Sequence, residues 1–282
     1  MKPYILLSND DGYQAAGLRC LIETLKPLGH LIVVAPDGPR SGYGCKITTK
    51  KPFTLHPVSH DEGLDVYACS GSPVDCVKLA FNILLPRLGI RPALVVSGIN
   101  HGDNSSVNSF YSGTMGVVTE GTFQGVASIG FSLCDMSAEA DFSACRPYIV
   151  RIVEKVLAEG LPPFTCLNVN FPRIDGIYGC SMDCNPVAAM PEKSDAAAAA
   201  APAGYKGIRV CRMARSAWIN EVAECRRPGS GSPYYWLTGE VKELEPEATD
   251  TDRWALYNGY VAVTPQTLDT TAYALLKDWK ME

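Results

Sequence analysis

The sequence contains no apolar run long enough to cross a membrane and no start of the basic, then apolar kind that marks a signal peptide. Its first residues lead instead to two carboxylates, Asp10 and Asp11. A net charge of -5 over 282 residues also gives no positive field to attract nucleic-acid backbones or anionic membranes. We therefore expect a cytoplasmic protein that binds neither a membrane nor a nucleic-acid polymer.

The chain also lacks the pairing expected of a disulfide framework or a zinc site. Its 11 cysteines are an odd number, scattered through predicted strands and helices, so reduced and mostly buried thiols are expected. Cys180 and Cys184 have the spacing of half a zinc site. No second cysteine or histidine pair follows at a usable spacing, and the pattern disfavours a structural zinc.

The sequence does contain a repeated alternation of short apolar runs and amphipathic segments. The first run, residues 4–7, is predicted to be a buried parallel strand because it is short and almost fully apolar. Further strands are predicted at 31–35, 64–68, 93–97, 127–133, 165–170 and 259–265, and helices at about 15–25, 73–84, 115–123 and 141–159. Residues 46–55 are also β-prone. This alternation predicts an α/β fold with a mostly parallel sheet flanked by helices.

A change of composition separates this pattern from a later segment. Residues 173–247 are rich in glycine, proline and alanine, with β-like pieces at 207–211 and 234–237. We interpret about 173–254 as an irregular β-hairpin excursion used in oligomer contacts. Its run of six alanines, 196–201, is too short for an isolated helix and is expected to be a loop. The prediction is one domain over 1–282, with a core of about 1–172 and 255–267 and a C-terminal helix over about 268–281.

Three polar loops follow three of the predicted core strands. They contain Asp10-Asp11, Asp37 to Ser41, and Asn100 to Asn104. Ligands of open α/β sheets bind outside the carboxyl ends of the strands, where these loops would meet. Carboxylate, hydroxyl and amide oxygens suit magnesium, manganese or calcium. The alternative is that these residues only form turns, in which Asn, Asp, Ser and Gly are common.

A further polar segment, Ser112-Gly113-Thr114, lies where a loop enters a predicted helix. A helix N-terminus offers free amide hydrogens and the positive end of the dipole to a phosphate. No cysteine or serine–histidine nucleophile is evident. A cation site beside a helix N-terminus that can bind phosphate therefore favours metal-assisted phosphoester hydrolysis. The alternative is again that these residues only form turns.

Six motifs occur in order along the chain. They are Asn9-Asp10-Asp11-Gly12; Ala35-Pro36-Asp37 with Ser41-Gly42; Gly71-Ser72-Pro73-Val74-Asp75-Cys76-Val77; Ser97-Gly98-Ile99-Asn100 with Gly102 and Asn104; Tyr111-Ser112-Gly113-Thr114; and Thr251-Asp252 with Gly259-Tyr260-Val261 and Val263-Thr264-Pro265. In this order they closely resemble the motifs of the SurE family of stationary-phase survival nucleotidases. The resemblance is dense over about 4–135 and thinner over 250–272.

The resemblance implies a Rossmann-like core and a 5′/3′-nucleotidase that hydrolyses nucleoside 5′- and 3′-monophosphates, with short polyphosphate as a substrate of some members. It also implies one divalent ion per subunit, Mg²⁺ or Mn²⁺, and a homodimer or homotetramer. By the same resemblance, the metal ligands are Asp10, Asp11, Ser41 and Asn100, and Asp10 and Asp11 are catalytic. The substrate or phosphate contacts are Asn104, Ser112, Gly113 and Thr114.

Several alternatives stay open. A metal-activated water assisted by one aspartate is favoured over direct attack by an aspartate. A non-catalytic nucleotide-binding regulatory protein on the same fold is the alternative function. A dinucleotide-dependent oxidoreductase is disfavoured, because no G-x-G-x-x-G follows the first strand.

Some loop residues have two readings. His101 is either a general acid or a plain loop residue, and Arg40 either contacts phosphate or is solvated. Asp37 is expected to hold the Ser41 loop. Ser106, where the family usually has glycine, and Gly38 to Arg40 depart from the family pattern, which leaves loop conformation and substrate preference open.

Overall fold

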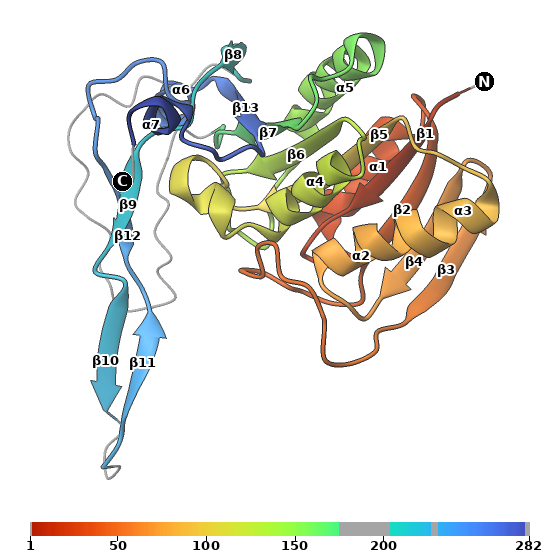
Figure 1. The fold of residues 1–282 in the computed structure, drawn as a ribbon, viewed down its shortest axis with the longest axis horizontal. Helices are drawn as coiled ribbons and strands as arrows, with labels where there is room; N and C mark the ends of the chain where they lie inside the picture. Colours follow the sequence, from red (N-terminus) through yellow and green to blue (C-terminus); the bar gives the residue numbers. More distant parts are fainter. Residues whose placement is uncertain (1, 175–203, 227–230, 280–282) are drawn as a thin grey trace.

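A computed structural model describes residues 2–174, 204–226 and 231–279. Within them, nine strands form one sheet in the order β3-β4-β2-β1-β5-β6-β7-β13-β8 (Figure 1). All pairings from β4 to β7 in that order are parallel. β3 and β13 pair antiparallel with their neighbours β4 and β7. The predicted α/β fold with a Rossmann-like, mostly parallel sheet is confirmed.

The strands of this sheet are β1 (Tyr4–Ser8), β2 (His30–Pro36), β3 (Leu55–Asp61), β4 (Leu64–Cys69), β5 (Leu94–His101), β6 (Ser128–Leu133), β7 (Thr165–Phe171), β8 (Ile208–Val210) and β13 (Val261–Thr267). The helices are α1 (Ala16–Leu25), α2 (Pro73–Leu79), α3 (Leu85–Leu88), α4 (Gly113–Phe123), α5 (Arg146–Glu159), α6 (Asp252–Tyr257) and α7 (Tyr273–Asp278). A π-helical turn, Ala80–Leu84, joins α2 to α3.

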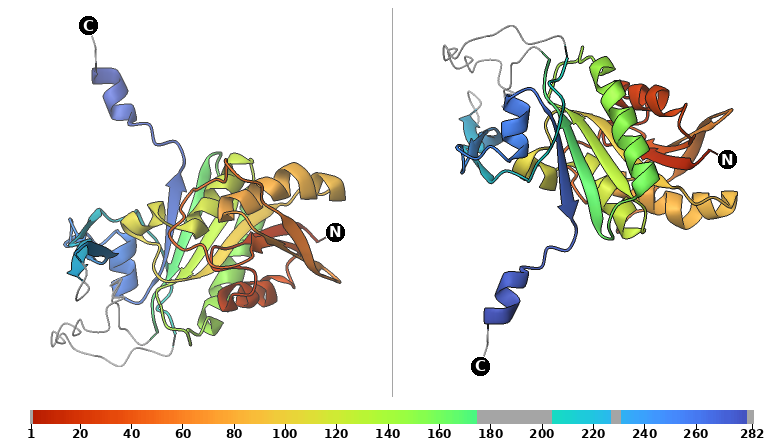
Figure 2. Two further views of the ribbon diagram at one scale, coloured as in Figure 1. Left: turned by 90° about the horizontal axis from the view of Figure 1, so that it is seen from below. Right: turned by 90° about the horizontal axis from the view of Figure 1, so that it is seen from above.

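Helices cover both faces of the sheet because its strands are apolar on both sides (Figure 2). Alternate residues of β1 point to opposite faces: Ile5 and Leu7 join one core, and Leu6 joins the other. The first core is closed by α1 and α5, and the second by α2, α3 and α4. This arrangement leaves the strand ends uncovered and places the loops that follow them at one edge.

The β-prone residues 46–54 form no strand; β3 begins only at Leu55. Side chains at the start of α2 take up the backbone groups of this segment instead. The Thr48 amide donates to Asp75 Oδ1 at 3.0 Å, and Ser72 Oγ donates to the Lys46 carbonyl at 2.6 Å. Since those groups are already paired, β-propensity alone did not decide the local structure.

Asp75 also closes a capping box at α2. Its carboxylate accepts from the Ser72 amide at 2.8 Å, and Ser72 Oγ accepts from the Asp75 amide. Burial alone would raise the pKa of Asp75, but hydrogen bonds from Thr48 and Ser72 outweigh it and lower the pKa.

We expect Asp75→Asn to lower the free energy of unfolding by about 1–2 kcal/mol at pH 7, because it removes one of the two acceptors. The lowered pKa means that the ionised carboxylate stabilises the fold above its ordinary value of 3.8 and loses this effect as the pH falls through the folded-state pKa. Urea unfolding between pH 7 and pH 3 should therefore show the gap between wild type and variant narrowing with acid. A gap that widens with acid would contradict this role.

A two-stranded arm projects from the α/β core (Figure 1). Its inner part pairs β9 (Ser216–Ile219) with β12 (Glu240–Glu243), and its outer part pairs β10 (Val222–Arg226) with β11 (Pro233–Leu237), both antiparallel. The predicted hairpin excursion is thus present. The alanine run 196–201 and the pair Cys180 and Cys184 lie outside the described residues.

Three differences from the predicted elements concern helices. α6 was not predicted, and α5 begins at Arg146 because Asp141 caps the Ser143 amide in a turn. α7 begins at Tyr273 rather than near 268, since the Asp269 side chain accepts from the Thr271 amide and keeps this stretch in a turn. None of the helices in the described part is both long and apolar enough to span a bilayer.

Candidate active site

The loop after β1 is shaped by Asn9 and Gly12. The Asn9 side chain donates to the Gly12 carbonyl at 3.0 Å and accepts from the Gly12 amide at 3.2 Å. Gly12 has a φ of 104° and lies against the Gly38 backbone, so a side chain would be strained there. Asn9 therefore supplies the turn, and the carboxylates of Asp10 and Asp11 are left for another role.

Asp10 is held in place by the first turn of α4. Its side chain is almost fully buried, and Thr114 Oγ1 donates to Asp10 Oδ1 at 2.7 Å. A Cβ atom on Gly113 would lie only 2.6 Å from Asp10 Cβ, so this close approach requires glycine. Burial and the neighbouring charge of Asp11 raise the pKa of Asp10 to about 6, against the opposing effect of the Thr114 hydrogen bond.

Asp11 has an oxygen with no partner. Its Oδ2 atom is buried and accepts no hydrogen bond within the described residues. Burial raises the pKa of Asp11, although a hydrogen bond from the His101 backbone opposes the shift. A buried, unsatisfied carboxylate oxygen beside a second carboxylate is costly unless a cation neutralises the pair. The residues present therefore fit a divalent cation.

Asn100, near the end of β5, and Ser41, in the loop after β2, line the same pocket. The Asn100 amide nitrogen donates to the carbonyls of His101 and Gly102, both at 3.1 Å. This leaves the Asn100 side-chain oxygen as the atom available to a ligand. Across residues 2–174, 204–226 and 231–279, no three His, Cys, Asp or Glu side chains form a ligand cluster. A cation here would thus rely on two carboxylates with neutral hydroxyl and amide oxygens.

The pocket at this edge has a volume of about 170 Å³. It brings together five of the predicted site residues: Asp10, Ser41, Asn100, Asn104 and Ser112. Asp11, Gly113 and Thr114 do not line it; Gly113 and Thr114 lie behind Asp10 and contact its side chain. Ser112 caps α4 by accepting from the Met115 amide at 3.1 Å.

Asn104 is fixed by polar residues that the sequence did not single out. Its amide side chain donates to Ser132 Oγ at 2.8 Å, and its backbone amide donates to Asn170 Oδ1 at 2.9 Å. Asn168 donates to the Asn104 carbonyl and accepts from Asn170. The signal was present: two asparagines at alternate positions of the predicted strand 165–170 point to the same face.

The structure shows the contacts of Asp37, Arg40 and His101, whose roles the sequence left open. Arg40 donates to Asp37 at 2.6 Å, so Asp37 does hold the loop that carries Ser41. His101 lines the pocket, but its ring packs edge-on against Phe142 at 4.8 Å, and burial lowers its pKa. His101 is therefore held partly by apolar packing.

The arm contributes one pocket-lining side chain, Trp218. Tyr111 and Met136 also line the pocket, and none of the three belongs to the predicted site residues. Trp218 Nε1 donates to Asn108 Oδ1 at 3.0 Å, which ties β9 to the loop after β5. These two residues are 110 positions apart, so no local sequence pattern linked them.

The loop after β5 is joined to the arm and to α6 at Ser106. Its backbone has a φ of 51°, its amide donates to Asp252 at 2.8 Å, and its hydroxyl donates to the Ala214 carbonyl at 2.9 Å. The Asp252 carboxylate also accepts from the Ala214 amide. Ser106 therefore keeps the left-handed conformation that suits glycine and adds hydrogen bonds that glycine cannot make.

Substitutions at Ser106 should separate these two effects. Ser106→Ala retains the strained backbone and loses the hydroxyl contacts, so we expect the free energy of unfolding to fall by about 1–2 kcal/mol. Ser106→Gly loses the same contacts but relieves roughly 1 kcal/mol of backbone strain, so its loss should be smaller. Urea denaturation measures both, and a glycine variant less stable than the alanine variant would contradict the account.

Fold and pocket define a class: an open, mostly parallel α/β sheet with an acidic pocket at the carboxyl ends of its strands. The family model for survival protein SurE matches residues 5–220, and the chain belongs to this family.

Relatives of known name resemble the chain along its whole length. A protein named 5′-nucleotidase SurE from Phocaeicola vulgatus is 51% identical over 100% of this chain and 98% of its own. A protein of the same name from Bacteroides fragilis is 47% identical over 99% and 98%. The crystal structure of the SurE protein from Aquifex aeolicus covers 98% of this chain and 97% of its own, with a TM-score of 0.74 and 36% identity.

Proposed function

We propose that this chain is a metal-dependent nucleotidase that hydrolyses nucleoside 5′- and 3′-monophosphates, with short polyphosphate as a further substrate. Full-length relatives named 5′-nucleotidase SurE support the nucleotidase activity. The observation that carries the metal dependence is the buried, unpartnered Asp11 Oδ2 next to the buried Asp10. Two such carboxylates side by side call for a cation.

Asp10, Asp11, Ser41 and Asn100 are the residues that would hold one divalent ion, Mg²⁺ or Mn²⁺. Such an ion would supply charge neutralisation at the phosphoryl oxygens and lower the pKa of a water molecule from 15.7 towards neutrality. All four donors are oxygens, which fits a hard cation.

The chain's own residues position the substrate and move the proton. Thr114 and Gly113 fix the Asp10 carboxylate, so its orientation does not change during the reaction. One of the two aspartates assists by accepting the proton of the attacking water. Asn104 and Ser112, which line the pocket, donate to the phosphoryl oxygens.

Tyr111, Met136 and Trp218 also line the pocket. Aromatic side chains hold nucleobases by stacking, worth about 1–3 kcal/mol per base. We expect Trp218→Ala to raise KM for a nucleoside monophosphate about tenfold and to leave KM for ribose 5-phosphate within about twofold. Equal changes for both substrates would place the base elsewhere.

Phosphate release tests the proposed function. A panel of nucleoside 5′- and 3′-monophosphates, with ribose 5-phosphate as the sugar control, should give turnover that favours the nucleotides. Nucleotide binding without phosphate release under any metal would instead favour the regulatory alternative.

The homodimer or homotetramer and the cytoplasmic location stay predictions. Large apolar side chains on the arm and on α7 support an oligomer, because they are exposed in the single chain: Tyr234, Tyr235, Trp236, Leu237, Tyr273, Leu275 and Leu276. Light scattering measures the assembly directly.

A further inference from the structure

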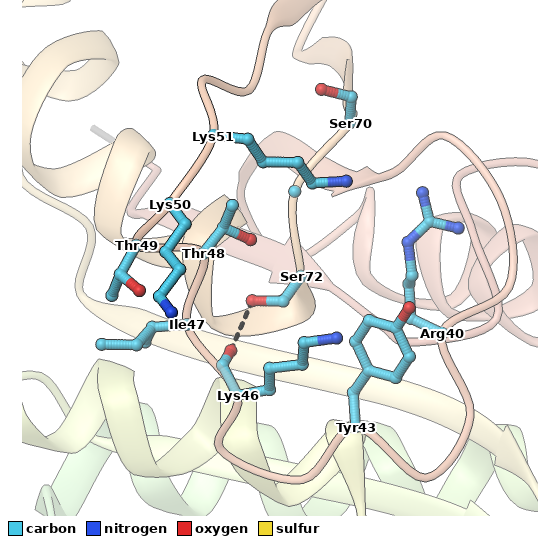
Figure 3. Close-up of a pocket in the computed structure, with 11 residues that line it drawn as sticks. Arg40, Tyr43, Lys46, Ile47, Thr48, Thr49, Lys50, Lys51, Ser70 and Ser72 are labelled. Atoms are coloured by element: carbon cyan, nitrogen blue, oxygen red, sulfur yellow. Dashed lines mark hydrogen bonds between the residues drawn. The ribbon is translucent and has the colours of Figure 1, made fainter.

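A second pocket, of about 330 Å³, shares the segment 40–44 with the candidate active site (Figure 3). Arg40 and Tyr43 line this second pocket, whereas Ser41 and Gly42 line the first. Its other walls are residues 46–51 and 70–72. Its size is at the lower end of the range for small-molecule sites, about 300–1,000 Å³.

Four cationic side chains line the second pocket: Arg40, Lys46, Lys50 and Lys51. Arg40 is paired with Asp37 at 2.6 Å. In the part of the chain that the structure describes, none of the three lysines has a carboxylate within ion-pair distance. Figure 3 shows Lys46 and Lys51 reaching towards Arg40, and the Lys46 ammonium lies 4.1 Å from the centre of the Tyr43 ring. This cationic group stands out in a chain of net charge -5.

The backbone that carries the lysines is anchored by hydrogen bonds to Ser70, Ser72 and Asp75. Ser72 Oγ donates to the Lys46 carbonyl, and the Thr48 amide donates to Asp75. Ser70 holds the far end of the segment by accepting from the Thr54 amide at 2.9 Å. These contacts explain why a β-prone segment leaves the sheet, and they bring its lysine side chains to one cavity rather than spreading them along a strand.

We propose that the second pocket binds a small anion with two linked phosphoryl groups, a diphosphate. A single phosphate group carries about -1.5 to -2 charge at pH 7, less than the three unpaired ammonium groups can neutralise. Lysine ammonium groups bind phosphate as point charges, and Thr49 and Ser70, whose hydroxyls are further donors, also line the pocket. The inference does not depend on the proposed nucleotidase activity.

The segment between the pockets connects them. The Arg40 amide donates to the Asp10 carbonyl at 2.7 Å, and the Gly44 amide donates to the Tyr111 carbonyl at 3.1 Å. A diphosphate held by Arg40 and Lys46 would therefore order the same segment that presents Ser41 to the candidate active site.

Calorimetric titration with inorganic diphosphate, in EDTA and without substrate, tests the proposal on the full chain. We expect Lys50→Gln with Lys51→Gln to weaken binding about tenfold or more. Lys26→Gln with Lys155→Gln removes the same charge from exposed positions outside the pocket, and should change the affinity by less than about twofold. No measurable binding by the wild type, or equal losses in the two double variants, would overturn the proposal.

Hydrogen–deuterium exchange locates the ligand. Diphosphate should slow exchange in residues 40–51 and leave 100–112 unchanged; protection of 100–112 alone would assign the ligand to the candidate active site and overturn the proposal. Adenosine diphosphate is the second ligand to be titrated. Equal affinities for it and for inorganic diphosphate identify the free anion as the ligand, and a tenfold preference for the nucleotide identifies a nucleotide tail bound by the same phosphate contacts.

Discussion

Asp10→Asn is expected to lower kcat/KM by roughly 10³-fold while raising the stability of the metal-free protein. Activity falls because the change removes one of the two carboxylates available to a cation. Stability rises because Asp10 is a nearly fully buried acid beside Asp11, and the neutral amide removes that charge. An asparagine oxygen can still accept from Thr114, so the packing persists.

We expect the free energy of unfolding in EDTA to rise by about 1–3 kcal/mol in this variant. Urea denaturation measures it, and Mn²⁺ should stabilise the wild type more than the variant. Thr114→Val serves as the matched control, because it keeps both carboxylates and removes only the hydrogen bond that orients Asp10. A variant with full activity, or one less stable than wild type in EDTA, would contradict the assignment of Asp10.

Gly113→Ala should be nearly as damaging, although it adds only a methyl group. That methyl would lie 2.6 Å from Asp10 Cβ and 2.8 Å from Asp10 Oδ2, closer than atoms can pack, so the carboxylate must move. A displacement of this kind costs about 10²-fold in kcat/KM. The overpacking itself should lower the free energy of unfolding by about 1–3 kcal/mol.

Gly231→Ala is the control for this change. No described residue lies within 4 Å of the Cβ position of Gly231, and its φ is not positive, so the same substitution should leave kcat/KM within about twofold there. An active Gly113→Ala enzyme with an unshifted KM would show that α4 does not position Asp10.

The core of the fold was predictable because its signals are local. Each strand from β1 to β7 apart from β3 was anticipated as an apolar run, and a parallel α/β sheet then places the following loops at one edge. By this rule the sequence predicts Asp10, Ser41 and Asn100 at one edge of the sheet, and in the structure all three line one pocket.

What the sequence could not supply depends on contacts between distant segments. Trp218 reaches the pocket because β9, in the inner part of the arm, contacts the loop after β5. Thr114, predicted from the family resemblance to contact phosphate, is fully buried with its hydroxyl committed to Asp10, a geometry that no spacing specifies. The second pocket was not predicted, because β-propensity favoured a strand for residues 46–55. Instead, Ser72 and Asp75 at the start of α2 hold this segment out of the sheet by hydrogen bonds.

The most direct test of the metal-dependent nucleotidase is phosphate release from adenosine 5′-monophosphate in EDTA, in Mg²⁺ and in Mn²⁺, for wild type and Asp10→Asn side by side. We expect turnover by the wild type only with a metal, and almost none by the variant under any condition. Wild-type turnover that persists unchanged in EDTA would contradict the account.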